Sequence, residues 1–225
     1  MKFIPADEIP YPDDFPLKEF LVNPSRQEKA QKDAVHQLLD KGANETLVDN
    51  YLREHPELLG ACMNFTQFGH HGTWVIPQQT VRPPLAPQQK GLKPDYVIGG
   101  KGSDGSRWYV IELKGVITPL FVEKKSGRIS LSGEANEGLM QLVSYIDYCG
   151  KAQAFLRDSL HLVDFSEPQG FLIIGRQSEL LSSQRKQQLR KALNHVLAGR
   201  IEVRTYDALV RSNGSSWTDR GDDTA

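Results

Sequence analysis

The strand at residues 107–114 (RWYVIELK) constrains the fold more than any other part of the sequence. Side chains alternate across a strand, so residues 108, 110, 112 and 114 share one face and residues 109, 111 and 113 share the other. Both faces begin with large apolar side chains, which is typical of a strand covered on both sides. Glu112 and Lys114 nevertheless stand together at its end. A charge buried alone there would cost several kcal/mol, so the two need each other, a metal ion or a cleft.

The elements around this strand predict an α/β fold with one mixed central sheet flanked by helices. Two helices come first, one from a Ser25 cap to Gly42 and one from an Asn44 cap to a break at His55-Pro56. The remaining expected elements are strands at 73–81, 94–99, 107–114, 170–176 and 201–206, and helices at 134–160 and 183–197. The first of these helices is either continuous or interrupted near Gly150.

The chain divides into three segments. Residues 1–43 form a Pro-rich arm and an N-terminal helix, residues 44–211 form the main domain, and residues 212–225 lack periodicity, which predicts a disordered tail. No run approaches the roughly 20 apolar residues of a membrane span. Two cysteines, Cys62 and Cys149, supply neither a disulfide framework nor a zinc cluster. We therefore expect a cytoplasmic protein with no membrane contact.

The charge is unevenly distributed although the formal net charge is only −1. Residues 1–60 hold seven Lys/Arg against twelve Asp/Glu, whereas residues 90–128 hold eight against four. A local basic field attracts a phosphate backbone whatever the overall charge, although an ordinary solvated surface explains it as well. The candidate nucleic-acid contacts are Lys90, Lys93, Lys124, Lys125 and Arg128. The basic helix at 183–200 is a further candidate, and an exposed amphipathic helix explains it almost equally.

A second carboxylate precedes the strand. Pro94-Asp95 begins the preceding strand, and a hairpin turn at 100–105 brings Asp95 beside Glu112. Two carboxylates, with the Leu113 carbonyl between them as a third ligand, suit Mg²⁺ that keeps several waters. Lys114 could then orient a water and offset charge on an attacked phosphate. The alternative is a structural ion pair at an exposed strand end.

The motif Pro94-Asp95…Glu112-Leu113-Lys114 resembles the signature of PD-(D/E)XK nucleases. The surrounding segments are similar to those of the Shedu-type anti-phage nucleases, over about residues 45–211. These segments are ETLVDNYLREHPELL (45–59), GLKPDYVIG (91–99), WYVIELKG (108–115), EANEGLMQLVSYIDY (134–148), GFLIIGR (170–176) and IEVRTYDALV (201–210).

The resemblance implies a restriction-endonuclease-like core and assigns roles to residues. Asp95 and Glu112 correspond to metal ligands for Mg²⁺ or Mn²⁺, and Lys114 to the catalytic lysine. Gln141 corresponds to the glutamine on the helix that follows the strand, and Glu45 to a helix-borne acid that assists metal binding. Glu45 is explained nearly as well as a first-turn residue favoured by the helix dipole. Glu134 and Glu137 could join the face of Gln141, but a solvated helix face is the simpler interpretation.

The resulting hypothesis is a metal-dependent DNA endonuclease that acts in anti-phage defence. We expect it to nick or cut double-stranded phage or plasmid DNA and to form homo-oligomers. The alternative is a nuclease-like fold that only binds nucleic acid or another defence protein. An RNA nuclease would use the same residues, and no feature of the sequence reads a 2′-hydroxyl.

Overall fold

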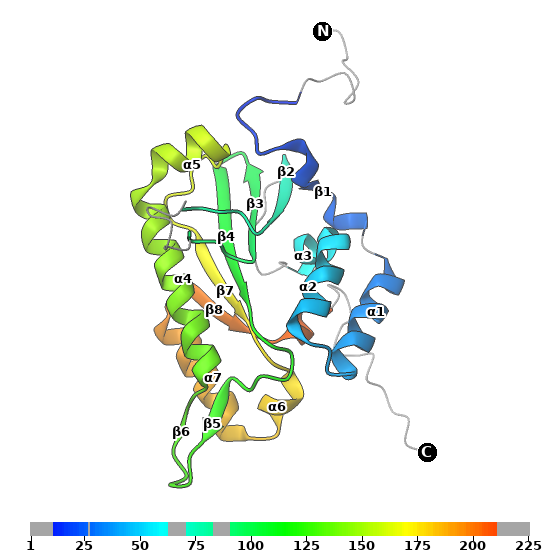
Figure 1. Cartoon of the computed structure of the whole chain (residues 1–225), viewed down its shortest axis with the longest axis vertical. Coiled ribbons are helices and arrows are strands. Elements are labelled where there is room, and N and C mark those ends of the chain that lie inside the picture. Colours follow the sequence, from blue (N-terminus) through cyan, green and yellow to red (C-terminus); the bar gives the residue numbers. More distant parts are fainter. Residues whose placement is uncertain (1–10, 27, 63–70, 83–90, 211–225) are drawn as a thin grey trace.

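The computed structural model describes residues 11–26, 28–62, 71–82 and 91–210 (Figure 1). Its main sheet has six strands in the order β1-β2-β3-β4-β7-β8, and a separate hairpin pairs β5 with β6. The strands are β1 Leu21–Val22, β2 Gly72–Pro77, β3 Tyr96–Gly102, β4 Gly105–Leu113, β5 Phe121–Glu123, β6 Ile129–Leu131, β7 Gln169–Ile173 and β8 Ile201–Arg204. The α-helices are α1 Lys29–Asp40, α2 Glu45–Glu54, α3 Pro56–Cys62, α4 Gly133–Lys151, α5 Gln153–Leu160, α6 Gln177–Leu181 and α7 Gln184–Val196.

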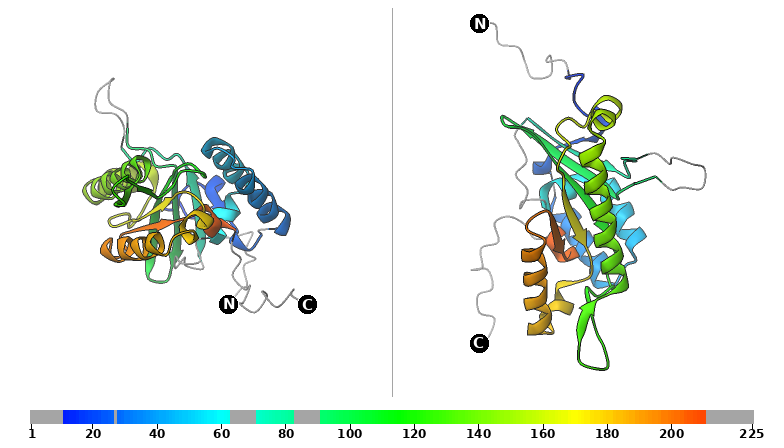
Figure 2. Two further views of the ribbon diagram at one scale, coloured as in Figure 1. Left: turned by 90° about the horizontal axis from the view of Figure 1, so that it is seen from below. Right: turned by 90° about the vertical axis from the view of Figure 1, so that its left-hand side faces the viewer.

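Helices cover both faces of the main sheet (Figure 2). Helices α1, α2 and α3 pack on the face that carries Tyr109, Ile111 and Leu113. Helix α4 packs on the other face, against Trp108 and Val110. The predicted alternation of β4 between two covered faces is therefore confirmed, as is the mixed α/β sheet flanked by helices.

The centre of the sheet is the predicted hairpin of β3 and β4. The strands are antiparallel, and Gly102 pairs with Gly105 across a two-residue loop. Gly105 has φ of 103°, a conformation that favours glycine. Strand β4 pairs in parallel with β7, which pairs in parallel with β8. The sheet is thus mixed, with β4 joining its antiparallel and parallel halves.

The ends of the N-terminal helices agree with the sequence predictions in part. The Asn44 side chain accepts a hydrogen bond from the Leu47 amide at 2.9 Å, so the predicted cap of α2 is confirmed. The break at His55-Pro56 is also confirmed, since α2 ends at Glu54 and α3 begins at Pro56. The predicted cap at Ser25 is wrong, because α1 begins at Lys29 and Glu28 forms a capping box with Gln31.

Three strands lie in segments for which the sequence predicts no strand. Leu21–Val22 pairs with β2 and extends the sheet at its edge. The segment before Ser132, predicted to be a loop, contains the β5–β6 hairpin, which projects beyond the main sheet (Figure 1). The predicted tail at 212–225 lies outside the described residues. No helix in the described ranges is long and apolar enough to span a bilayer.

Gly99 lies directly opposite Trp108 in the β3–β4 ladder, and this close approach generates a prediction. A Cβ at Gly99 would lie 2.7 Å from Cδ2 of Trp108 and nearer still to two other ring carbons. Gly99→Ala should therefore lower the free energy of unfolding by about 1–3 kcal/mol, measured by urea titration. Gly133→Ala is the control, because a Cβ there meets nothing within 4 Å. Equal stabilities of the two variants would contradict the prediction.

Candidate active site

The end of β4 carries a connected set of polar side chains. The Lys114 Nζ donates to Glu112 Oε1 at 2.9 Å and to Gln141 Oε1 of α4 at 2.8 Å. Glu112 is only 5% exposed, so its carboxylate depends on these partners. The structure therefore brings together Glu112, Lys114 and Gln141, three of the residues singled out by the sequence.

Gly138 of α4 lets the Lys114 side chain lie between the helix and the sheet, a role that the sequence analysis did not identify. A Cβ at Gly138 would lie 3.1 Å from Cε of Lys114 and 2.6 Å from Cδ1 of Leu172. A larger residue would push α4 outward and move Gln141 away from the ammonium group. Gly138 is thus part of the packing that fixes the site.

Asp95 lies beside the end of β4, where the hairpin was predicted to place it. Its Oδ2 accepts a hydrogen bond from the Leu113 amide at 2.7 Å. Burial raises the pKa of Asp95 in spite of this bond. Burial, followed by the charge of Asp95, raises the pKa of Glu112 to about 7, against the effect of Lys114. The charge of Asp95 thus opposes the ionisation of Glu112, as the charge of Asp49 opposes that of Asp95.

Lys114 retains its charge in this setting. Burial acts to lower the pKa of Lys114, but the hydrogen bond and charge of Glu112, with the charges of Glu137 and Glu45, outweigh burial and raise it. The ammonium group is therefore protonated at neutral pH and can hold an anionic or polar atom near Glu112.

Glu45 and Asp49 of α2 line a cavity of about 390 Å³ together with Asp95 and Leu113. Burial, then the charge of Asp95, raises the pKa of Glu45. Helix α2 therefore brings the predicted acid to the same site from the opposite face of the sheet. The side chain of Leu113 is buried, and its carbonyl stays a predicted ligand.

Asp49 is a site residue that the sequence analysis missed. Its Oδ1 accepts from the Tyr96 hydroxyl at 2.6 Å, and its Oδ2 accepts from Arg53 Nη2 at 2.7 Å. The bond from Tyr96 attaches α2 to β3 immediately after Asp95, and the bond from Arg53 lies within α2. The spacing of four residues from Glu45, which places both on one helix face, is the signal that could have identified it.

Tyr145 of α4 contributes a polar group to the site as well as a buried ring. Its ring is buried, but its hydroxyl donates to Glu112 Oε2 at 3.3 Å and lies equally close to the Lys93 carbonyl oxygen. Both oxygens of Glu112 therefore have a partner on or next to α4. Tyr145 follows Gln141 by one helical turn, so both side chains lie on the same face of α4. This spacing is the signal in the sequence that could have identified the contact between Tyr145 and Glu112.

The donor set near Asp95 suits a hard divalent cation. Among the described residues, no group of three or more His, Cys, Asp or Glu side chains could hold a metal ion by themselves. Asp95 and Glu112 offer two carboxylates, each destabilised as an anion by burial and by a nearby carboxylate, Asp49 for Asp95 and Asp95 for Glu112. Mg²⁺ commonly binds one or two carboxylates and keeps several waters, so the residues present fit this ion.

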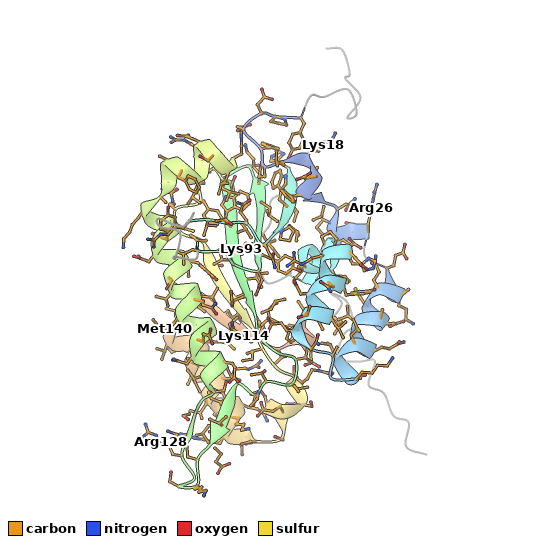
Figure 3. All side chains as sticks on the ribbon, in the orientation of Figure 1. Lys18, Arg26, Lys93, Lys114, Arg128 and Met140 are labelled. Atoms are coloured by element: carbon orange, nitrogen blue, oxygen red, sulfur yellow. The ribbon has the colours of Figure 1, made fainter. Side chains whose placement is uncertain are left out.

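The predicted nucleic-acid contacts do not form one cluster. Lys93 lies near Tyr145, while Lys124, Lys125 and Arg128 are exposed at the turn between β5 and β6, and Figure 3 shows Arg128 far from Lys93 and Lys114. Lys90 lies outside the described residues. In the basic helix α7, Lys186 forms an ion pair with Glu179.

The raised pKa of Glu112 predicts a pH-dependent stability. The pKa of this carboxyl is near its ordinary value of 4.5 in the unfolded chain and about 7 in the folded protein. The stability that Glu112 contributes is therefore complete below pH 4.5 and is lost as the pH rises through about 7. In metal-free buffer, the wild type should lose about 1–3 kcal/mol more than Glu112→Gln between pH 5 and pH 8, measured by urea unfolding.

The control for this prediction is Glu123→Gln, which changes an exposed carboxylate on β5. That variant should follow the wild-type pH dependence. If the stability of Glu112→Gln had the same pH dependence as that of the wild type, the raised pKa of Glu112 would be contradicted.

Most of the chain matches a model of a known protein family. A family model described as "Shedu protein SduA, C-terminal" matches residues 42–210. This range contains Glu45, Asp95, Glu112, Lys114 and Gln141. No curated protein matches the sequence. Because the family model covers most of the chain, the chain belongs to the family of Shedu protein SduA C-terminal domains.

Proposed function

We propose that this chain is a metal-dependent DNA endonuclease of the PD-(D/E)XK type that acts in anti-phage defence. The observation that carries the proposal is the bonded set of Glu112, Lys114 and Gln141 beside Asp95. Family membership supports the link to defence. A protein that only bound DNA would have no need to bury an ionisable glutamate and a lysine at the end of its central strand, which supports the enzyme over the binding module.

The side chains have separate roles in the proposed reaction. Asp95, Glu112 and the Leu113 carbonyl would hold Mg²⁺ or Mn²⁺. Glu45, which lines a cavity together with Asp95 and Leu113, would assist metal binding. The bound ion supplies charge stabilisation for the phosphate and lowers the pKa of a water. Lys114 orients the attacking water and offsets negative charge that develops on the phosphate.

The surrounding residues keep Lys114 and Glu112 in position. Gln141 accepts one Lys114 hydrogen bond and leaves the ammonium group with a further donor for water or phosphate. Tyr145 holds the second oxygen of Glu112. These hydrogen bonds hold the Lys114 ammonium group and the Glu112 carboxylate at a constant separation. The proposed reaction requires this fixed geometry.

Lys114→Met tests catalysis most directly. Methionine retains an apolar stem that can pack beside Gly138 but removes the ammonium group. Nicking of supercoiled plasmid in Mg²⁺ should fall about 10²–10³-fold, as for the loss of one electrostatic group at a reaction centre. Lys151→Ala, at an exposed position near the end of α4, should retain activity.

The outcomes separate the proposed enzyme from a contaminant. Cutting that is abolished by EDTA and by Lys114→Met supports the assignment. Cutting that persists undiminished in Lys114→Met contradicts the role of this site. Plasmid left intact by the wild type in Mg²⁺ and Mn²⁺, while DNA is still bound, favours the binding module.

Asp95→Asn tests the metal site without DNA. A ligand that binds only the folded state at 100 times its Kd stabilises it by about 2.7 kcal/mol. Mg²⁺ or Mn²⁺ should therefore raise the melting temperature of the wild type but not that of Asp95→Asn. Asp147→Asn, an exposed position on α4, should respond as the wild type does. An equal metal response in Asp95→Asn would place the ion elsewhere.

A further inference from the structure

A second and larger cavity lies beside the active site. It has a volume of about 970 Å³, within the range of about 300–1,000 Å³ that is typical of ligand sites. One wall is the α4 face that includes Gln141 and Tyr145, the residues that contact Lys114 and Glu112. A molecule in this cavity would therefore lie next to the reaction centre.

The opposite wall is held in place by main-chain hydrogen bonds. Leu92 donates to the Arg82 carbonyl at 2.9 Å, and its own carbonyl accepts from Val81 at 2.9 Å. Leu92, which forms this bridge, and Lys93, the next residue, both line the cavity. The Lys93 carbonyl lies near the Tyr145 hydroxyl. The two walls are thus connected at the end nearest Glu112.

The lining combines apolar surface with hydrogen-bonding groups. Met140 is 56% exposed on α4 and forms part of the cavity, as does Leu92. Asn136 and Ser144 lie on the same face of α4, one helical turn before and after Met140. Such a lining fits a flat aromatic ring that carries polar groups at its edge, and a nucleobase has these properties.

Two cationic side chains, Lys93 and Arg82, belong to the segments beside the cavity. The Lys93 ammonium group donates to the neutral Gln78 side chain at 3.0 Å, and the Arg82 guanidinium lies 5.4 Å from the centre of the Tyr148 ring. Within the described ranges, neither forms an ion pair with a carboxylate. Glu137 is the carboxylate that lines the cavity, and it can accept from a base amino group. Figure 3 shows Lys93 and Lys114 on the same side of α4.

We propose that this cavity binds the base of an unpaired nucleotide next to the scissile phosphate. A paired base is stacked inside the duplex and exposes only its edge, so only a base that has left the stack can enter. The inference rests on the proposed nuclease function and specifies its substrate: DNA with an unpaired nucleotide at the cleavage position is bound and cut in preference to a fully paired duplex.

The test uses two labelled duplexes of the same sequence, one fully paired and one with a single unpaired 2-aminopurine nucleotide. Affinity is measured by fluorescence anisotropy in buffer without divalent cations. The wild type should bind the unpaired DNA about tenfold more tightly, as expected for one stacked base, and the 2-aminopurine emission should change on binding.

Ser144→Trp fills the cavity from α4, and Val143→Trp places the same side chain at the neighbouring exposed position, which does not line it. The preference should disappear in Ser144→Trp and remain in Val143→Trp, with both variants showing wild-type circular dichroism. Equal affinity of the wild type for the two duplexes, or a preference that survives in Ser144→Trp, overturns the proposal.

Parallel cleavage in Mg²⁺ separates this proposal from the proposed function. A binding preference lost in Ser144→Trp, without cleavage by any variant, supports the base site and overturns the endonuclease. Cleavage of both duplexes at equal rates supports the endonuclease and overturns the base site.

Discussion

The burial of Glu112 at the end of the central strand is the constraint on which the site depends. An ionised carboxylate in that position requires partners, and the structure supplies Lys114 from the same strand and Tyr145 from α4. Asp95 adds a second negative charge from the adjacent strand. Helices on both faces of the sheet must therefore dock in register with β4, since α4 contributes bonds to one face and α2 brings Glu45 and Asp49 from the other.

The elements predicted from sequence are those that local rules determine. The alternation along β4, the Asn44 cap and the break at Pro56 each depend on residues close together in the chain. The pairing of Asp95 with the end of β4 follows from the hairpin, because the register of a two-residue turn leaves little freedom. Glu112 and Lys114 were found from the alternation along this strand, whereas Gln141 was assigned only by the family resemblance.

The parts that sequence did not reveal depend on packing between distant segments. Gly138 matters only because α4 approaches β4 closely, and Asp49 matters only because Tyr96 lies beneath α2. The edge strand at Leu21–Val22 is two residues long, too short for a periodic pattern. The β5–β6 hairpin likewise has strands of three residues each, and its position separates the cations at its turn from the active site.

The two-residue connection between β3 and β4 also has a kinetic consequence. Hairpins form in about 1–10 μs, so Asp95 and Glu112 meet early, while water still surrounds both. Their repulsion is then weak, because the local dielectric is that of the solvent. Only when α4 covers this face does desolvation make the two charges oppose one another. We therefore expect the docking of α4, rather than the formation of the hairpin, to be the folding step that responds to pH, because it is the step that buries Glu112.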